Sequence, residues 1–453
     1  MSILRKLKGK RLIAFIIAMV MILTTVLSVP IVRRASESKN DNVSDQASAE
    51  KSSEDKTSKD KNNAASAEAE EEIAKLNEQI KNSPDDADLY LKRAGYFSKL
   101  QKYDEALADY TQAIALDPKA NTYYLRAMCY ILRTEHELAY EDLKNALAQE
   151  PENIDYLSSM ADVCSALKKY EENIAILEKL LAKDSQNAIL YAMAGDTSVY
   201  LSDIKGAIAH YNNAIKYYSD AASKAGISKE SLYAAKGNCL KTNAQYSEAV
   251  TAYNQSLKIA ETTSLYFQRG FCLIQLGEYN EAIKDFTKAI DKNYEVPLSM
   301  FQRGLCYYST GKYEQAIGDF SAYEVAFPSK TDSFLYKGLC LQHLKKYSEA
   351  IQYLEKSIQA GTSVGDCNFN IGNCYYNQEK YTESIPYYTK AIDANTQVYS
   401  AYLNRGVAYL KTNKYNEAKA DLKKVIDECS DKDLVATASK HYEPIKNITI
   451  ITK

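Results

Sequence analysis

The chain has 453 residues, and its 56 Lys and Arg nearly balance 59 Asp and Glu, for a formal net charge of −3. This balance provides no bulk attraction to nucleic acid, so we expect no nucleic-acid partner. Only 16 Gly and 8 Pro occur, and 38 Tyr stand beside 10 Phe and no Trp. The scarcity of helix breakers favours a helical chain, long enough for several domains or one extended array.

Residues 1–34 combine a basic start with an apolar run. Five Lys and Arg precede an uncharged, mainly apolar stretch of 21 residues from Leu12 to Val32, and Arg33 and Arg34 follow it directly. A helix of that length spans about 30 Å, the hydrocarbon thickness of a bilayer. The excess of basic residues before the run predicts a single-pass anchor in the cell membrane, with the N-terminus cytoplasmic and the remainder extracytoplasmic. A cleaved signal peptide is the alternative.

Residues 35–68 consist mostly of Ser, Lys, Asp, Glu, Asn and Ala. They include no aromatic residue, and Val43 is their only large aliphatic side chain. Such a segment buries too little apolar area to offset the entropy lost on ordering, so we predict a disordered linker. Residues 69–86 regain an apolar pattern and are predicted to form a capping helix.

Ten copies of one pattern occupy residues 87–432. Six contain the step Tyr-x-x-Ala, as in Tyr103 to Ala106. Aligned on that alanine, successive copies lie 33 or 34 residues apart, with one spacing of 42 between the fourth and fifth. Two runs of helical periodicity in each copy predict a pair of antiparallel helices. Twelve residues before the alanine lies a position, here called the small position, that always holds Ala or Gly: Ala94, Ala127, Ala161, Gly195, Gly237, Gly270, Gly304, Gly338, Gly372 and Gly406.

The pattern resembles the tetratricopeptide repeat, and the whole chain resembles a membrane-anchored, bacterial-type member of that family. The family unit is a 34-residue helix–turn–helix with small residues where the helices approach and a closing proline, matched here by Pro118, Pro151 and Pro328. The resemblance implies an all-α, right-handed superhelical solenoid of about ten repeats whose inner groove holds a peptide or a partner helix. Eight extra residues around 219–229 should lengthen a turn or helix, and residues 433–453 should form a closing helix and tail.

The nine cysteines do not suggest disulfides. Six of them lie two residues after a small position, so each is at least one whole repeat from the next, on the order of 10 Å or more and beyond the reach of a disulfide. We therefore expect them to be small core residues. The four histidines are scattered, and we predict no metal site and no cofactor. The six cysteines are Cys129, Cys239, Cys272, Cys306, Cys340 and Cys374.

Arginine directly precedes the small position in five repeats, and an aspartate follows it sixteen residues later in those same five. The other five repeats have neither residue. This all-or-none occurrence predicts an ion pair that joins the two helices of a repeat. The alternative is a clamp for a partner's terminal carboxylate, which some family members build from basic residues in the groove. The arginines are Arg93, Arg126, Arg269, Arg303 and Arg405.

In the family, the inner face of the first helix includes the positions three before, one after and four after the small residue. In repeats three to five these positions are mainly polar, as at Ser158 and Asp162. In repeats six to eight they are apolar, and apolar surface of that extent usually marks a contact site. Packing into the core is the alternative. The predicted groove residues are Phe267, Phe271, Ile274, Phe301, Leu305, Tyr308, Leu335 and Leu339.

Motifs of common catalytic sites are missing from the sequence. It contains no Gly-rich phosphate loop, no Gly-x-Ser-x-Gly and no His-Glu-x-x-His, so we predict no catalytic residues and no enzyme activity. The pattern predicts a membrane-tethered scaffold that binds protein or peptide partners during assembly of cell-envelope complexes. One alternative is an adaptor that faces the cytoplasm; another is an auxiliary subunit that contacts a glycan or polymer at a membrane enzyme.

Overall fold

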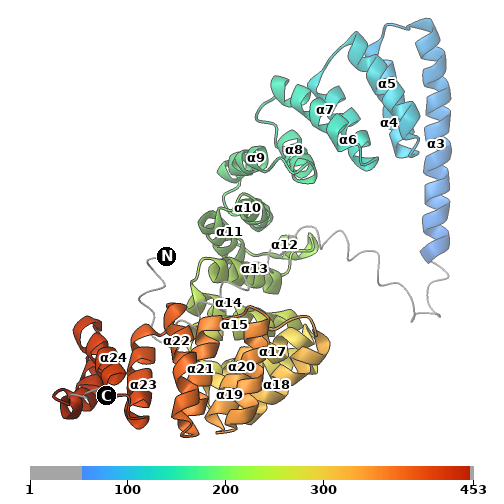
Figure 1. Cartoon of the computed structure of the whole chain (residues 1–453). Coiled ribbons are helices and arrows are strands. Elements are labelled where there is room, and N and C mark those ends of the chain that lie inside the picture. Colours follow the sequence, from blue (N-terminus) through green and yellow to red (C-terminus); the bar gives the residue numbers. More distant parts are fainter. Residues whose placement is uncertain (1–53, 449–453) are drawn as a thin grey trace. The chain divides into compact units, whose positions relative to one another are not determined.

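The computed structural model describes the backbone of residues 54–448 and the side chains from residue 66 onward (Figure 1). The predicted membrane anchor at residues 1–34 and the first part of the predicted linker lie outside this range. Within it, no helix is both long enough and apolar enough to cross a membrane. The described chain divides into two compact parts, here called the N-terminal body (54–261) and the C-terminal body (262–448).

Each predicted repeat is a pair of helices, and the ten pairs confirm an all-α repeat fold. The right-handed course of the superhelix stays a prediction. In the N-terminal body the pairs are α4 (Ala87–Lys99) with α5 (Tyr103–Leu116), α6 (Ala120–Leu132) with α7 (His136–Gln149), α8 (Ile154–Ala166) with α9 (Tyr170–Lys183), α10 (Ala188–Tyr200) with α11 (Ile204–Lys216), and α13 (Lys229–Thr242) with α14 (Tyr246–Ile259).

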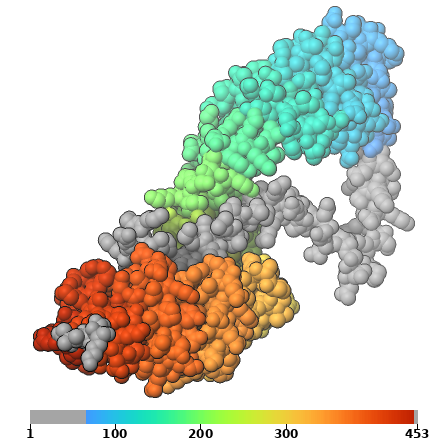
Figure 2. All heavy atoms as spheres, in the orientation of Figure 1, coloured from blue at the N-terminus to red at the C-terminus, as the bar shows by residue number. Residues whose placement is uncertain are grey.

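The C-terminal body continues the same alternation, and on the face shown in Figure 2 its successive repeats form a continuous surface. Its pairs are α15 (Thr263–Leu276) with α16 (Tyr279–Asp291), α17 (Val296–Ser309) with α18 (Tyr313–Ala326), α19 (Asp332–His343) with α20 (Tyr347–Gln359), α21 (Val364–Asn377) with α22 (Tyr381–Asp393), and α23 (Val398–Lys411) with α24 (Tyr415–Glu428).

The small position is where the two helices of a repeat come closest. A Cβ atom added to Gly237 would lie 2.6 Å from the ring of Tyr253, and one added to Gly304 would lie 2.8 Å from the ring of Phe320. The large residue comes from the second helix, four residues after the aligned alanine, and both of these rings are fully buried. A large side chain thus fills the space that the missing side chain leaves, and this contact sets the distance between the paired helices.

Helix α3 (Glu54–Asn82) packs on α4 at the N-terminal end (Figure 1). Its buried side chains Ala69, Ile73 and Leu76 share one face, which covers the first repeat where we predicted a capping helix. The predicted linker is corrected in part, because residues 54–68 belong to α3. Ala, Glu and Lys have high helix propensity, and a helix anchored by its buried turns extends through such residues.

Helix α25 (Lys432–Tyr442) and the short 3₁₀ helix η2 (Glu443–Ile445) follow the last repeat. Ala438 and Ile445 are buried in one cluster with Leu422 and Val425 of α24. The extra residues between repeats four and five form α12 (Asp220–Lys224). Ala222 and Ile227 of this insertion are buried beside α11 and α13, so the insertion enlarges the core of the N-terminal body.

Two Gly→Ala variants in repeat seven test the role of the small position. Gly304→Ala is expected to lower the free energy of unfolding by about 1–3 kcal/mol, because the new methyl group overlaps the Phe320 ring. Gly318→Ala, in an open position on α18 with no atom within 4 Å of the added Cβ, is expected to raise it by about 0.5–1 kcal/mol. Denaturant unfolding followed by far-ultraviolet circular dichroism measures both. Equal effects would show that the close approach does not limit the packing.

Candidate binding surfaces on the first helices

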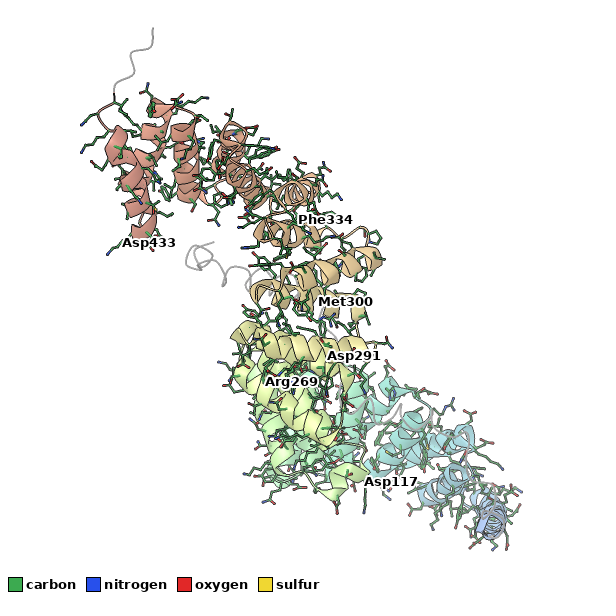
Figure 3. All side chains as sticks on the ribbon, turned by 90° about the horizontal axis from the view of Figure 1, so that it is seen from below. Asp117, Arg269, Asp291, Met300, Phe334 and Asp433 are labelled. Carbon is green, nitrogen blue, oxygen red and sulfur yellow. The ribbon has the colours of Figure 1, made fainter. Side chains whose placement is uncertain are left out.

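The first helices of successive repeats line one side of the C-terminal body. Helices α15, α17, α19, α21, α23 and α25 each contact the next one in this series, in addition to the second helices between them. Their contact with one another places them on the inner side of this body's curvature. Figure 3 shows the side chains along the helices, with Arg269 and Phe334 labelled on α15 and α19. This inner side is where the groove was predicted.

The predicted groove residues of repeats six to eight are not equally accessible. Phe267, Phe271, Ile274 and Leu305 are buried, at 9% exposure or less. The Phe267 ring packs edge-on against Phe286, with centroids 5.6 Å apart. These four side chains therefore belong to the core in this structure, as the alternative reading held. The accessible part of the predicted groove consists of half-buried residues, Phe301, Tyr308, Leu335 and Leu339.

Even the accessible rings contact other aromatic rings of the C-terminal body. Phe301 lies 4.8 Å from Tyr323, and Tyr308 lies 6.1 Å from Tyr336 and 5.9 Å from His343, between ring centroids. Burial raises the pKa of Tyr308 to about 12, so its hydroxyl stays protonated at neutral pH. Repeats six to eight thus offer a partly covered aromatic surface. Binding of a partner to this surface stays a prediction.

The inner face of repeat three is polar and open. Ser158, Asp162 and Ser165 project from α8 and are all exposed. The surrounding protein nevertheless raises the pKa of Asp162 through desolvation. Helix α8 therefore presents exposed polar side chains in the N-terminal body.

All five predicted Arg–Asp pairs form, and each is bidentate. The guanidinium Nε and one terminal nitrogen donate to the two carboxylate oxygens at 2.6–2.8 Å. The arginine side chains are 14–21% exposed and the aspartates 5–9%. The hydrogen bonds from Arg126 to Asp142 raise the arginine pKa, so that it remains charged. The pairs join the two helices of a repeat, which supports the structural reading over a carboxylate clamp.

The same arginines also connect neighbouring repeats. Arg303 donates through Nη1 to the hydroxyl of Thr287 at 3.0 Å, and Arg405 donates to Thr389 at 2.8 Å, each acceptor lying on the preceding second helix. In the first repeat the acceptor is Asn77 of α3, at 2.6 Å from Arg93. Helix α3 therefore acts as the second helix of a half-repeat, and each of these arginines ties three helices together.

Three repeats without this arginine use a tyrosine in its place. The residue after the small position accepts a hydrogen bond from the tyrosine hydroxyl on the second helix: Asp196 from Tyr211 at 2.6 Å, Asn238 from Tyr253 at 2.9 Å and Asn373 from Tyr388 at 2.9 Å. Repeat eight instead pairs the buried Lys337 with Glu324 of the preceding helix at 2.9 Å. In these four repeats, hydrogen bonds or an ion pair between other side chains thus connect neighbouring helices in place of the Arg–Asp pair.

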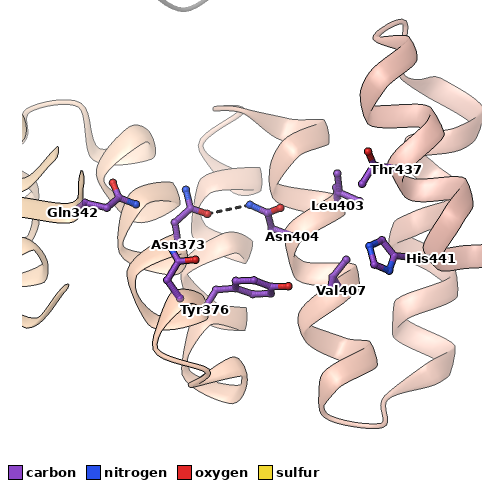
Figure 4. Close-up of a pocket in the computed structure, with 9 residues that line it drawn as sticks. Gln342, Asn373, Tyr376, Leu403, Asn404, Val407, Thr437 and His441 are labelled. Atoms are coloured by element: carbon purple, nitrogen blue, oxygen red, sulfur yellow. Dashed lines mark hydrogen bonds between the residues drawn. The ribbon is translucent and has the colours of Figure 1, made fainter. Parts of the chain in front are cut away.

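A cavity of about 380 Å³ opens on the inner side near the C-terminal end (Figure 4). It lies between α19, α21, α23 and α25, and in Figure 4 Asn373 and Asn404 face each other while Thr437 and His441 project from α25. Burial, with a smaller effect from Lys440 and Lys411, lowers the pKa of His441 and so favours its neutral form. The lining residues are Gln342, Asn373, Tyr376, Asn377, Leu403, Asn404, Val407, Thr437 and His441.

This cavity was not predicted from the sequence. Two of its four amides occupy groove positions, Gln342 four residues after and Asn373 one residue after a small position, and these two would have signalled a polar inner face. Its fourth wall comes from α25, whose placement no repeat pattern specifies.

Within the described residues, none of the nine cysteines forms a disulfide, and eight are buried. The same residues contain no group of three or more His, Cys, Asp or Glu arranged to hold a metal ion. Burial raises the pKa of Cys239 and Cys374 to about 12, which suppresses the reactive thiolate. These thiols pack as core residues, as their spacing predicted.

Comparison with known proteins agrees with this geometry. Two family models, both described as tetratricopeptide repeat, match residues 273–331, 311–363 and 369–433 in one case and 87–119 and 230–263 in the other. The chain is a tetratricopeptide-repeat protein. The matches at 87–119 and 230–263 each cover one helix pair of the N-terminal body, and the other matches span several helices of the C-terminal body.

Two relatives share part of this tetratricopeptide-repeat protein. Small glutamine-rich tetratricopeptide repeat-containing protein 2 of Saccharomyces cerevisiae is 33% identical over 133 residues, which is 29% of this chain and 38% of the relative. The Hsp70-Hsp90 organizing protein of Triticum aestivum is 30% identical over 118 residues, 26% of this chain and 20% of the relative. The similarity therefore spans well under half the length of either relative.

Among solved structures, a tetratricopeptide repeat protein from Parabacteroides merdae is similar over 56% of this chain and 98% of its own, with 17% identity and a TM-score of 0.41. Naa15/Naa10 bound to HypK-THB is similar over 84% of this chain and 66% of its own, with 14% identity and a TM-score of 0.44.

The Arg–Asp pair can be tested in the last repeat. Arg405→Met is expected to lower the free energy of unfolding by about 1–3 kcal/mol, because it leaves the buried Asp421 without its charged donors. Lys423→Met removes an exposed pair with Asp427 in the same repeat and should leave the unfolding midpoint unchanged. Denaturant unfolding of both variants measures the difference. If Arg405→Met is as stable as the wild type, the pair does not hold the helices together and the clamp reading regains support.

Proposed function

We propose that this protein is a membrane-tethered scaffold that binds partner proteins or peptides on the inner faces of its first helices. The observation that carries the proposal is the accessible inner side of the C-terminal body. There, half-buried apolar groups such as Leu335 and Leu339 lie near a cavity lined by amides. Family membership supports it, and so does the name of the relative from Triticum aestivum, which describes an organizer of two other proteins.

Binding to a preformed array explains how such a protein acts without a catalytic step. The Arg–Asp and tyrosine connections hold the helices in place before any partner arrives, so little conformational entropy is lost on association. Half-buried apolar residues contribute contact area, while amide side chains orient the bound segment. We propose no catalytic residue, metal or cofactor in this mechanism.

Capture from native membranes tests the binding face. The full-length chain serves as bait beside a variant that carries Leu335→Ser and Leu339→Ser, after circular dichroism confirms that the variant folds. Val325→Ser on α18, where the valine is 82% exposed, is the matched control. We expect the double variant to capture its principal partner about tenfold less well, because two apolar contacts are lost, and the control to behave as wild type. Equal capture by all three baits would show that the partner binds elsewhere on the protein.

We further propose that residues 1–34 anchor the chain in the cell membrane, with the repeats extracytoplasmic, where they assemble cell-envelope complexes. The apolar run from Leu12 to Val32 and its flanking basic residues support this orientation. Alkaline phosphatase and green fluorescent protein fused after Lys453 report the topology. Active phosphatase and a dark fluorescent fusion in the membrane fraction are expected. The opposite pattern would make the protein an adaptor that faces the cytoplasm, and phosphatase activity in the soluble fraction would indicate a cleaved signal peptide.

A further inference from the structure

Repeat three, formed by α8 and α9 in the middle of the N-terminal body (Figure 1), lacks both kinds of polar contact that join paired helices in eight other repeats. Met160 and Ile176 replace the Arg and Asp of the ion pair. Asp162 occupies the position at which Asp196 of repeat four accepts from a tyrosine hydroxyl, but Leu177 lies where that tyrosine would be. Within the part of the chain that the structure describes, no side chain of α8 forms a hydrogen bond or an ion pair with α9.

The polar side chains of α9 bond to other parts of the array instead. Glu172 accepts from the hydroxyl of Tyr140 on α7 at 2.8 Å. Lys183 pairs with Glu152 in the turn before α8, but both of these side chains are exposed, and such pairs contribute little. Helices α8 and α9 are therefore held together mainly by apolar contacts. Because such contacts have no preferred direction, two helices joined in this way can shift without breaking a bond between them.

A buried amide also interrupts the apolar packing of this repeat. Asn173 occupies the aligned position, at which eight of the ten repeats have Ala, and it is 1% exposed. Its Nδ2 donates to Thr197 Oγ1 of α10 at 3.2 Å. Thr197 donates its own proton to the carbonyl of Met193, so it can only accept from the amide, and this fixes the orientation of the amide.

The other end of this amide has no partner. Among the described residues no donor reaches Asn173 Oδ1, which is shielded from solvent. An unpaired buried acceptor raises the free energy of the closed repeat, because it has lost its hydrogen bonds to water. When the helices separate, water reaches the oxygen and this cost disappears. The amide therefore shifts the equilibrium of repeat three toward opening.

We propose that repeat three is the point at which the N-terminal body opens. The contact between α8 and α9 loosens and recloses in the native protein more often than the contacts within repeats two and four, which an Arg–Asp pair and a tyrosine bond hold together. The segments on either side, α3 to α7 and α10 to α14, move as units about this contact. The array can thus change its curvature when a partner binds while every other repeat stays folded.

Hydrogen–deuterium exchange of the full-length chain, followed by mass spectrometry of its peptic fragments, measures this opening. After correction for intrinsic rates, we expect the amides of α8 and α9 to exchange at least about tenfold faster than those of repeats two and four. Asn173→Ala introduces the residue that most repeats have and should slow exchange in α8 and α9 by about tenfold, because the closed repeat no longer contains an unpaired acceptor. Exchange in repeats one and five should stay unchanged.

Two further variants make the test specific. Asn173→Leu keeps the branched shape of the amide and should slow exchange as Asn173→Ala does, without the void that a smaller side chain can leave. Ser384→Ala in repeat nine is the matched control. Ser384 occupies the same aligned position and is fully buried, but its hydroxyl donates to the carbonyl of Tyr381. Since this hydroxyl is already paired, its removal should leave exchange in α21 and α22 unchanged.

The inference is overturned if α8 and α9 are protected as well as repeats two and four in the wild type. Unchanged or faster exchange in both Asn173 variants would also reject it, because the amide would then not favour the open state. If Ser384→Ala slows exchange in repeat nine as much as Asn173→Ala does in repeat three, alanine at this position stabilises any repeat. The unpaired oxygen would then not be the cause of opening.

Discussion

The distance between the two helices of each repeat is set by one kind of contact, a large side chain from the second helix lying against an Ala or Gly of the first. In repeat five Tyr253 fills the space above Gly237, and in repeat seven Phe320 fills the space above Gly304. Because the buried side chain and the absent one are complementary, neither helix can shift without opening a void or creating an overlap. Everything placed on the first helices, including the amides of the cavity, takes its position from this contact.

A second, polar set of contacts determines which side chains are available to a partner. Where Arg and Asp join the helices, the arginine donates its hydrogen bonds to the aspartate and to the preceding repeat. It is therefore not available to a ligand in the groove. Where a tyrosine hydroxyl replaces that pair, as at Tyr388, the connection ends on an amide that still has a donor to spare. Differences between repeats that are neutral for the fold thus decide whether a repeat presents a closed surface or one able to form hydrogen bonds.

The periodic features could be predicted from the sequence, and the features that depend on contacts between repeats could not. The regular spacing of the small residues located all ten helix pairs, and the joint occurrence of Arg and Asp predicted their pairing. Spacing does not show how closely the next repeat covers a side chain, so Phe267 and Leu305 were assigned to a groove although they are buried. The linker was predicted from its lack of apolar residues, yet residues 54–68 extend a helix that is stabilised further along. The cavity depends on a contact between Asn373 and Asn404, which are 31 residues apart in sequence, and on the position of α25. Neither follows from the repeat pattern.

The buried cysteines provide native sites for chemical labelling in several repeats along the chain. Six repeats carry a thiol two residues after the small position, and each of these thiols is buried. A thiol reagent can reach such a sulfur only when the surrounding helices separate, so the rate of labelling at each cysteine reports how often that particular repeat opens. Since neighbouring repeats stabilise one another, labelling rates read along the chain would give a profile of local stability in the native protein without any engineered label. A bound partner would appear in that profile as a stretch of slowed labelling.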